Sequence, residues 1–240
     1  MSPARALTRD AGSNGADRSG ADGTSTLAVL WDMDGTLIES QPLWDAAFTR
    51  LCEERGGTVS PAVLASLAGA SEPGTRALIA ATGAAADAED PVAYEITDAM
   101  NAEVGDLVVA EPPLVDGALA ITAELAGLGV AQAIVSASRR RLVEAVAEAL
   151  GSAITALVTG EDGLAPKPSP EPYATGVERV GVPARRCVVV EDSLTGVGSA
   201  RAAGLDTIQL GSAPLRPDDG GVRLVRSLAD LTPEALGVAR

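Results

Sequence analysis

Residues 27–36 read Leu-Ala-Val-Leu-Trp-Asp-Met-Asp-Gly-Thr, and this stretch indicates how the chain folds. Its first five residues form an apolar run typical of a buried strand, and Asp32 and Asp34 follow at once. In an extended backbone, residues two positions apart point the same way, and Gly35 allows a sharp turn after them. The stretch therefore predicts a buried strand that delivers two carboxylates to one edge of a sheet.

Four later apolar runs resemble this first strand, and helical segments with start signals lie between them. The runs cover residues 130–135, 154–158, 187–190 and 206–210, and the helical segments follow Asp116, Ser138, Ser169-Pro170 and Ser193. Alternating strands and helices favour right-handed crossovers and a parallel sheet that is covered on both faces. We expect an α/β fold with a Rossmann-like open parallel sheet.

The pattern changes between the first strand and the second. Residues 39–112 contain amphipathic helical stretches and no convincing strand, so we expect an inserted α-helical cap, with Pro112-Pro113 as its return hinge. The core would then comprise residues 27–38 and 113–240. Residues 1–26 are rich in Ala, Gly, Ser, Asp and Arg, and we expect them to form a flexible tail.

Composition excludes several classes of protein. The formal net charge is -15, which argues against the basic face that nucleic acids or anionic membranes require. No apolar run approaches the roughly 20 residues of a membrane span, and no secretory signal is evident. Cys52 and Cys187 lack metal-ligand spacing and are expected to be reduced. We expect a cytoplasmic monomer or homodimer without nucleic-acid or membrane partners.

Two features of the residue usage restrict the chemistry. The chain has no histidine, which excludes Ser-His-Asp and Cys-His triads and histidine-ligated zinc. Catalysis must then depend on carboxylates. Lys167 is the single lysine among 18 basic residues, which makes it a candidate for a specific role rather than a solvated cation.

Polar residues follow the predicted strands at the edge where ligands of open parallel sheets bind. They are Asp32, Asp34, Ser136, Glu191 and Asp192, with Lys167 in the loop after the third strand. A carboxylate that attacks phosphorus forms an aspartyl phosphate, and a second carboxylate can transfer protons. Converging carboxylates near a phosphate need a cation, and Mg²⁺ prefers oxygen ligands. The pattern therefore predicts magnesium-dependent phosphoryl transfer.

The motifs DMDGT (32–36), Ser136, Lys167-Pro168 and VVVEDS (188–193) together resemble the four signature motifs of the haloacid dehalogenase superfamily. The resemblance implies that Asp32 is the nucleophile and Asp34 the acid/base. It also implies that Ser136 and Lys167 bind phosphate and that the metal ligands are Asp32, Asp34, Asp192 and Glu191, with orientation of Lys167 as the alternative for Glu191. The insert resembles the helical cap of the branch containing beta-phosphoglucomutase, phosphoglycolate phosphatase and sugar-phosphate phosphatases.

Some residues keep two interpretations. Ser138 is the alternative to Ser136, since either hydroxyl can start a helix. In the cap, Trp44 and Arg76 are candidates to face the active site, together with Glu39, Gln41 and Glu72. Trp44 can equally pack in the core, and Arg76 can be a surface charge.

The function predicted from these residues is a magnesium-dependent phosphatase acting on a small phosphorylated metabolite through an aspartyl phosphate. The enzymatic alternative is a phosphosugar mutase of the beta-phosphoglucomutase type. Against it, Trp44 stands where those mutases carry a histidine. Residues 67–76, although they end in Arg76, also lack the arginine that those mutases carry in their substrate loop. A catalytically silent binding protein is a third reading, disfavoured because Asp32, Asp34, Lys167 and Asp192 are all present.

Overall fold

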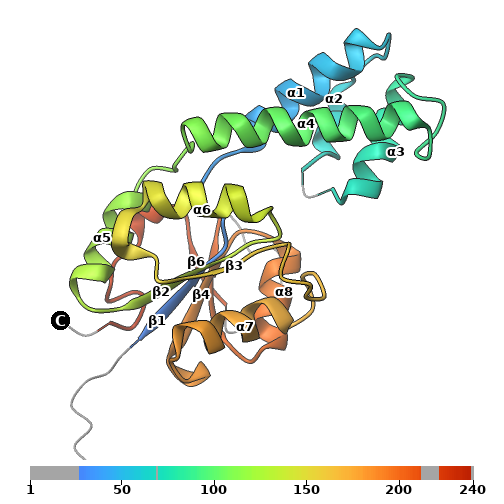
Figure 1. Ribbon diagram of the computed structural model, residues 1–240. Helices are drawn as coiled ribbons and strands as arrows, with labels where there is room; N and C mark the ends of the chain where they lie inside the picture. Colours follow the sequence, from blue (N-terminus) through green and yellow to red (C-terminus); the bar gives the residue numbers. More distant parts are fainter. Residues whose placement is uncertain (1–26, 69, 212–221, 239–240) are drawn as a thin grey trace, which may run out of the picture.

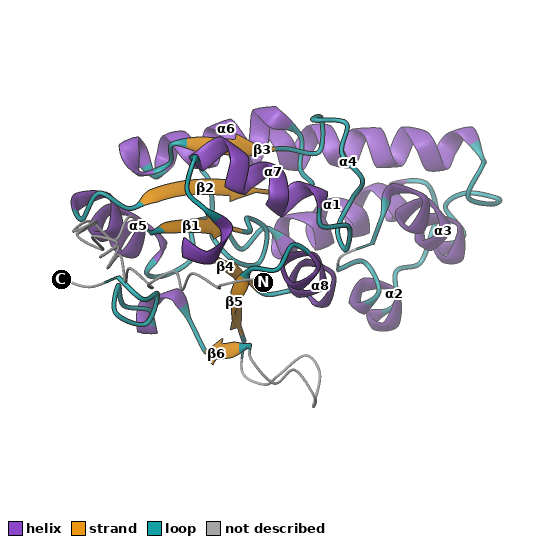
Figure 2. Cartoon of the chain, turned by 90° about the horizontal axis from the view of Figure 1, so that it is seen from below, coloured by secondary structure: helices purple, strands orange, loops and turns teal. Residues whose placement is uncertain are grey.

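The computed structural model describes residues 27–68, 70–211 and 222–238, so the expected flexible tail lies outside the described residues. Six parallel strands form one sheet in the order β3-β2-β1-β4-β5-β6, which Figure 2 shows from below. The strands are β1 (Ala28–Trp31), β2 (Ala131–Val135), β3 (Ala156–Val158), β4 (Cys187–Glu191), β5 (Asp206–Leu210) and β6 (Arg223–Val225). The predicted open parallel sheet is confirmed.

Four helices cover the sheet, two on each face (Figure 1). They are α5 (Ala118–Gly127) and α6 (Arg140–Ala149) on one face, and α7 (Glu171–Val180) and α8 (Leu194–Ala202) on the other. Side chains alternate along β1, so Val29 and Trp31 pack with one apolar cluster, whereas Ala28 and Leu30 pack with the other. All four are fully buried, as expected for a central strand of a parallel sheet.

The segment between β1 and β2 is helical, as predicted. It contains α1 (Gln41–Glu54), α2 (Pro61–Ala65), α3 (Glu72–Thr82) and α4 (Pro91–Ala110), and Figure 1 shows them grouped beyond the end of the sheet. Proline near the first turn of each helix suits the start of a helix, because its missing N–H has no partner there anyway. Apolar residues of α1, α3 and α4, including Phe48, Ile79 and Ile96, form the interior of this cap.

Some local features differ from the sequence prediction. Strand β6 was not predicted, because Arg223–Val225 is too short to show a periodicity. Ser193 caps α8 by accepting a hydrogen bond from the N–H of Gly196, as expected. In contrast, Arg139 precedes α6, since the Ser138 hydroxyl is engaged elsewhere. None of the described helices is both long and apolar enough to span a bilayer.

Candidate active site

The carboxyl ends of the central strands bring the predicted site residues together. Strand β1 lies between β2 and β4, with Trp31 paired to both Ile134 and Val190. The N–H of Asp32 continues this ladder by donating to the carbonyl of Val190 at 3.0 Å. Residues that follow these three strands therefore meet at one edge, where the sequence pattern predicted a site.

Lys167 is the centre of the polar network at this edge. Its Nζ lies 2.6 Å from Asp32 Oδ1, 2.7 Å from Glu191 Oε1, 3.0 Å from the carbonyl oxygen of Val135 and 3.2 Å from Tyr173 Oη. The side chain is only 11% exposed. Burial lowers the pKa of Lys167, but the neighbouring carboxylates raise it by more, so the ammonium stays charged. The only lysine of the chain thus orients the carboxylate of Asp32, the residue that follows β1.

Glu191 is fully buried, and both of its carboxylate oxygens are hydrogen-bonded. Oε1 accepts from Lys167 and from the hydroxyl of Tyr173 at 3.1 Å. Oε2 accepts from the N–H and the hydroxyl of Ser193 at 2.9 and 3.0 Å. Burying a carboxylate is costly unless its oxygens are hydrogen-bonded in this way. Glu191 therefore positions Lys167 and at the same time fixes the start of α8.

Tyr173 was not predicted as a site residue. It projects from α7, is fully buried, and also places its ring 4.7 Å from Lys167 Nζ. Burial and the charge of Glu191 raise the pKa of Tyr173, so its hydroxyl keeps its proton for donation to Glu191. In the sequence Tyr173 looks like an ordinary apolar position of an amphipathic helix, which explains why it was missed.

Asp34 is held by two hydroxyl groups from different parts of the chain. Ser40 Oγ donates to Oδ1 at 2.7 Å, and Ser138 Oγ donates to Oδ2 at 2.8 Å. Ser40 immediately precedes α1 of the cap, whereas Ser138 lies in the loop after β2. The second carboxylate is thus linked to both the cap and the core.

Ser136 and Ser138 both lie at the site but have different partners. Ser136 is buried, and its hydroxyl oxygen accepts a hydrogen bond from the N–H of Ser138 at 3.0 Å. The hydroxyl hydrogen of Ser136 is therefore available to a further acceptor. Ser138 instead donates to Asp34, a contact for which the sequence had no signal because the two residues are 104 positions apart.

The carboxylates of Asp32, Glu191 and Asp192 form a compact acidic cluster, with one oxygen of each within 4.8 Å of the others. Burial raises the pKa of Asp32 well above its usual value, against the opposing charge of Lys167. Burial and the charge of Glu191 raise the pKa of Asp192 to about 6. Ionising Asp32 and Asp192 therefore costs free energy in this environment, which is the behaviour expected of carboxylates that bind a cation. The donor set fits an oxygen-ligated divalent metal.

Two glycines make this close packing possible. A Cβ atom at Gly35 would lie 2.1 Å from Asp192 Oδ2, and one at Gly196 would lie 1.5 Å from Glu191 Oε1. Gly35 also has a φ of +88°, in the left-handed region that side chains disfavour. Gly35 therefore leaves room for the carboxylate of Asp192, and Gly196 leaves room for the carboxylate of Glu191.

The loop that precedes Lys167 is anchored by Asp162. Its carboxylate accepts from the N–H of Thr159 at 2.7 Å and forms ion pairs with Arg140 and Arg179, both at 2.9 Å. The hydrogen bond from Arg179 is the main cause that lowers the pKa of Asp162 to about 2. Asp162 therefore connects this loop to α6 and α7, an architectural role.

The cap candidates occupy different positions. Trp44 is partly buried and packs against the apolar core. Arg76 Nε donates to the carbonyl of Ala88, and its guanidinium lies 4.2 Å from the ring centroid of Tyr94, so Arg76 is engaged within the cap. Glu72, in contrast, forms an ion pair with Arg139 of the core.

The other two cap candidates, Glu39 and Gln41, flank Ser40. Glu39 is exposed and accepts from the N–H of Gln41 at 3.2 Å. The Gln41 amide donates to Asp45 at 2.8 Å. The Gln41 side chain therefore makes its contact within α1. Glu39 directly precedes Ser40, the serine whose hydroxyl holds Asp34.

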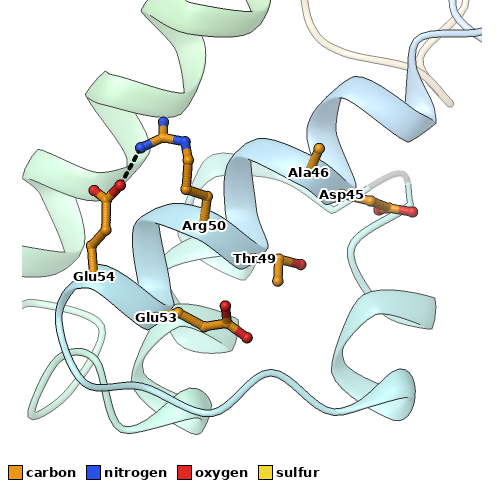
Figure 3. Close-up of a pocket in the computed structure, with 6 residues that line it drawn as sticks. All are labelled: Asp45, Ala46, Thr49, Arg50, Glu53 and Glu54. Atoms are coloured by element: carbon orange, nitrogen blue, oxygen red, sulfur yellow. Dashed lines mark hydrogen bonds and ion pairs between the residues drawn. The ribbon is translucent and has the colours of Figure 1, made fainter.

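A separate surface hollow of about 620 Å³ lies along the exposed side of α1 (Figure 3). Its lining residues are Asp45, Ala46, Thr49, Arg50, Glu53 and Glu54. They all come from one helix, and they include none of the residues at the edge of the sheet. Figure 3 shows Arg50 turned toward Glu54, to which it is paired. This hollow is a feature of the cap surface and does not belong to the carboxylate site.

Comparisons with known proteins show which family and which fold this chain resembles. A family model for haloacid dehalogenase-like hydrolases matches residues 26–204. A phosphoglycolate phosphatase from Xanthomonas campestris is 32% identical over 185 residues, which are 75% of this chain and 81% of that protein. Hexitol phosphatase A from Escherichia coli is 31% identical over 207 residues, covering 85% and 92%. The crystal structure of CbbY from Rhodobacter sphaeroides with phosphate superposes with a TM-score of 0.71 at 26% identity, covering 89% and 100%.

Proposed function

This chain belongs to the haloacid dehalogenase-like hydrolases, and we propose that it is a phosphatase that hydrolyses the phosphate monoester of a small metabolite. The names of its relatives support a phosphoglycolate-like ester or a sugar or hexitol phosphate as the substrate class. One observation carries the proposal above all. Lys167, the single lysine of the chain, contacts the carboxylate of Asp32 within a buried, otherwise acidic site.

The proposed reaction uses Asp32 and Asp34 in two steps. A carboxylate oxygen of Asp32 attacks phosphorus, the bond to the leaving oxygen breaks, and Asp34 supplies the proton that the leaving alcohol needs. Water then attacks the phosphorus of the aspartyl phosphate, Asp34 accepts a proton from it, and phosphate leaves Asp32 as a free carboxylate. Asp34 can reach the reacting atoms once it loses its hydrogen bond from Ser40 or from Ser138.

Lys167 and Ser136 are the proposed phosphate ligands of the protein. Lys167 already orients Asp32, and its ammonium can also neutralise a phosphoryl oxygen that approaches that carboxylate. Ser136 can donate its hydroxyl hydrogen, because its oxygen accepts from Ser138. Positioning and charge neutralisation are the main demands of phosphoryl transfer.

We further propose that Asp32, Asp192 and the backbone carbonyl of Asp34 hold a magnesium ion. Glu191 completes the acidic cluster, but its two oxygens already accept four hydrogen bonds, which favours the orientation of Lys167 as its main role. When bound, Mg²⁺ would offset the charge of the carboxylates and of the phosphoryl group.

The division of the chain into a core and an inserted cap supports a motion in which the cap closes over the core. We propose that residues 39–112 form a cap that covers the core (27–38 and 113–240) during the reaction and opens for product release. Residues at the boundary include Ser40, whose hydroxyl reaches Asp34. The cytoplasmic location and the monomeric or homodimeric state stay predictions from composition.

Hydrolysis is favoured over the mutase alternative. A mutase must hold its aspartyl phosphate away from water until a second hydroxyl of the substrate arrives. Trp44 and Arg76 do not offer the polar groups that such a transfer would require at the cap, since Trp44 packs against the core and Arg76 is engaged by Ala88 and Tyr94.

The test is the release of phosphate from an aryl phosphate and from a panel of metabolite esters. We expect turnover with Mg²⁺, none in excess chelator, and recovery when Mg²⁺ is restored. Asp32→Asn should abolish turnover, because the amide cannot form the acyl phosphate. The matched control is Asp206→Asn, which makes the same change at the exposed, amino end of β5.

Three outcomes would contradict parts of the proposal. Normal turnover of Asp32→Asn would exclude Asp32 as the nucleophile, and full activity in chelator would exclude the metal. For the mutase alternative, beta-glucose 1-phosphate is incubated with a trace of the bisphosphate. Glucose 6-phosphate forming much faster than free phosphate would replace hydrolysis by transfer.

A further inference from the structure

An ion pair joins the cap to the core beside the catalytic carboxylates. Glu72, the first residue of α3, lies 3.9 Å from the guanidinium of Arg139, which precedes α6. Arg139 directly follows Ser138, whose hydroxyl contacts Asp34 at 2.8 Å. Both charged side chains are exposed, Arg139 to 61% and Glu72 to 62%. A cap carboxylate therefore lies at the solvent-accessible side of the site.

The cap provides further negative charge there but no free positive charge. Glu39 is exposed and adjoins Ser40, the other hydroxyl that holds Asp34. The cap has three basic residues, and each is engaged elsewhere. Arg50 pairs with Glu54 and Glu103, Arg55 pairs with Glu95, and Arg76 lies over Tyr94.

We propose that this charge arrangement selects substrates whose non-reacting end is neutral and rich in hydroxyl groups, such as polyol phosphates, over esters that carry a second anionic group. The inference rests on the proposed phosphatase function. Glu72 acts as the specificity-determining residue, because it pairs with Arg139, the cation that follows Ser138 and that a substrate carboxylate would otherwise use. Glu72 and Glu39 can accept hydrogen bonds from substrate hydroxyls, whereas a carboxylate would be repelled by them.

The strength of the selection follows from exposure. An exposed ion pair is worth at most about 1 kcal/mol, so removing one charge of the pair alters selectivity by at most about fivefold. Because the interaction is coulombic and exposed, added salt should weaken it. The weakness of the pair also allows the cap to separate from the core during turnover.

The test compares substrates that differ only in the charge of their distal group. One pair is 2-hydroxyethyl phosphate and phosphoglycolate, and the other is glucitol 6-phosphate and 6-phosphogluconate. In each pair a hydroxymethyl group is replaced by a carboxylate. The measured quantity is the ratio of kcat/KM, neutral over anionic, at pH 7.5 and low salt.

We expect the wild-type ratio to favour the neutral member of both pairs and to fall with added salt. Glu72→Gln should lower the ratio by about two- to fivefold, because Arg139 is then free to bind the carboxylate. Combining Glu72→Gln with Arg139→Gln should remove that gain. Glu54→Gln is the matched control, since it also removes a cap carboxylate from an arginine pair, but on the outer side of α1 (Figure 3).

The outcomes separate this inference from the proposed function. If the wild type hydrolyses no ester at all, including an aryl phosphate, the phosphatase function itself fails. If it hydrolyses esters but prefers the carboxylate members, the inference is overturned and Arg139 binds the distal group. An unchanged ratio in Glu72→Gln, or the same change in Glu54→Gln, would show that Glu72 does not determine the selectivity.

Discussion

Replacing Asp192 by asparagine should make the metal-free protein more stable, although it should impair metal binding. Asp192 lies in the acidic cluster with Asp32 and Glu191, and burial and the charge of Glu191 raise its pKa to about 6 from 3.8. A folded protein that holds such a group ionised at neutral pH pays a free-energy cost. Asparagine has nearly the same size and removes that cost.

The magnitude follows from the pKa difference between the folded and unfolded states. A difference of about 2 pKa units, at 1.36 kcal/mol per unit, corresponds to about 3 kcal/mol at pH 7.5. The weak hydrogen bond from Thr36, at 3.4 Å, changes with the substitution and reduces the gain. We therefore expect Asp192→Asn to raise the free energy of unfolding by about 1–3 kcal/mol in chelator.

The pH dependence has a defined sign. Between about pH 4 and pH 6 the folded wild type binds the proton of Asp192 more tightly than the unfolded chain does, so its stability falls as pH rises through this window. Above pH 6 the cost is fully present. The difference between variant and wild type should thus be largest at pH 7.5 and about half as large at pH 5.

The assay is urea denaturation in chelator, followed by the fluorescence of Trp31 and Trp44, at pH 5 and pH 7.5. Asp206→Asn serves as the control, because Asp206 is exposed at the opposite end of the sheet. Added Mg²⁺ should stabilise the wild type far more than Asp192→Asn. A variant that is no more stable than the wild type in chelator at pH 7.5, or a gain that is equal at both pH values, would refute the reasoning.

Two further predictions concern residues that support Lys167. Tyr173→Phe keeps the buried ring but removes the hydroxyl that contacts Lys167 and Glu191, so kcat on an aryl phosphate should fall by about three- to tenfold; an unchanged kcat would limit Tyr173 to packing. Asp162→Asn should destabilise the protein at pH 7, because the pKa of Asp162 is lowered to about 2, mainly by Arg179, and its stabilisation is present above pH 3.8. The deficit in Tm should shrink toward pH 3, and a deficit that does not change with pH would contradict this role.

Much of the candidate site was predictable because it follows directly from local sequence. Asp32 comes immediately after an apolar run, and Glu191 ends another, so their positions at the carboxyl ends of parallel strands follow from chain direction alone. Lys167 was recognisable because it is the only lysine. These signals require no knowledge of how distant side chains meet.

Other site residues carried no such signal. Ser138 and Ser40 hold the two oxygens of Asp34, but serines before helices are usually helix caps. Tyr173 occupies an apolar position of α7, and its hydroxyl has a role only because the fold brings it within 3.1 Å of Glu191 at the end of β4. For Arg76, a cap candidate in the sequence, the structure adds contacts with Tyr94 and Ala88 that the sequence could not predict.

Apolar periodicity and chain direction predicted the succession of the first five strands and their helices, the helical insert and the residues that end the central strands, because these are local properties. The partner of each polar group, in contrast, follows from tertiary contacts. Lys167 and Asp32 are separated by 135 positions, and Glu72 and Arg139 lie in different parts of the fold. The Lys167–Asp32 pair forms because folding brings charged groups to one desolvated edge, where each must find a partner. The Glu72–Arg139 pair forms where the exposed start of α3 meets the residue that precedes α6. The spacing of residues along the chain predicts neither contact.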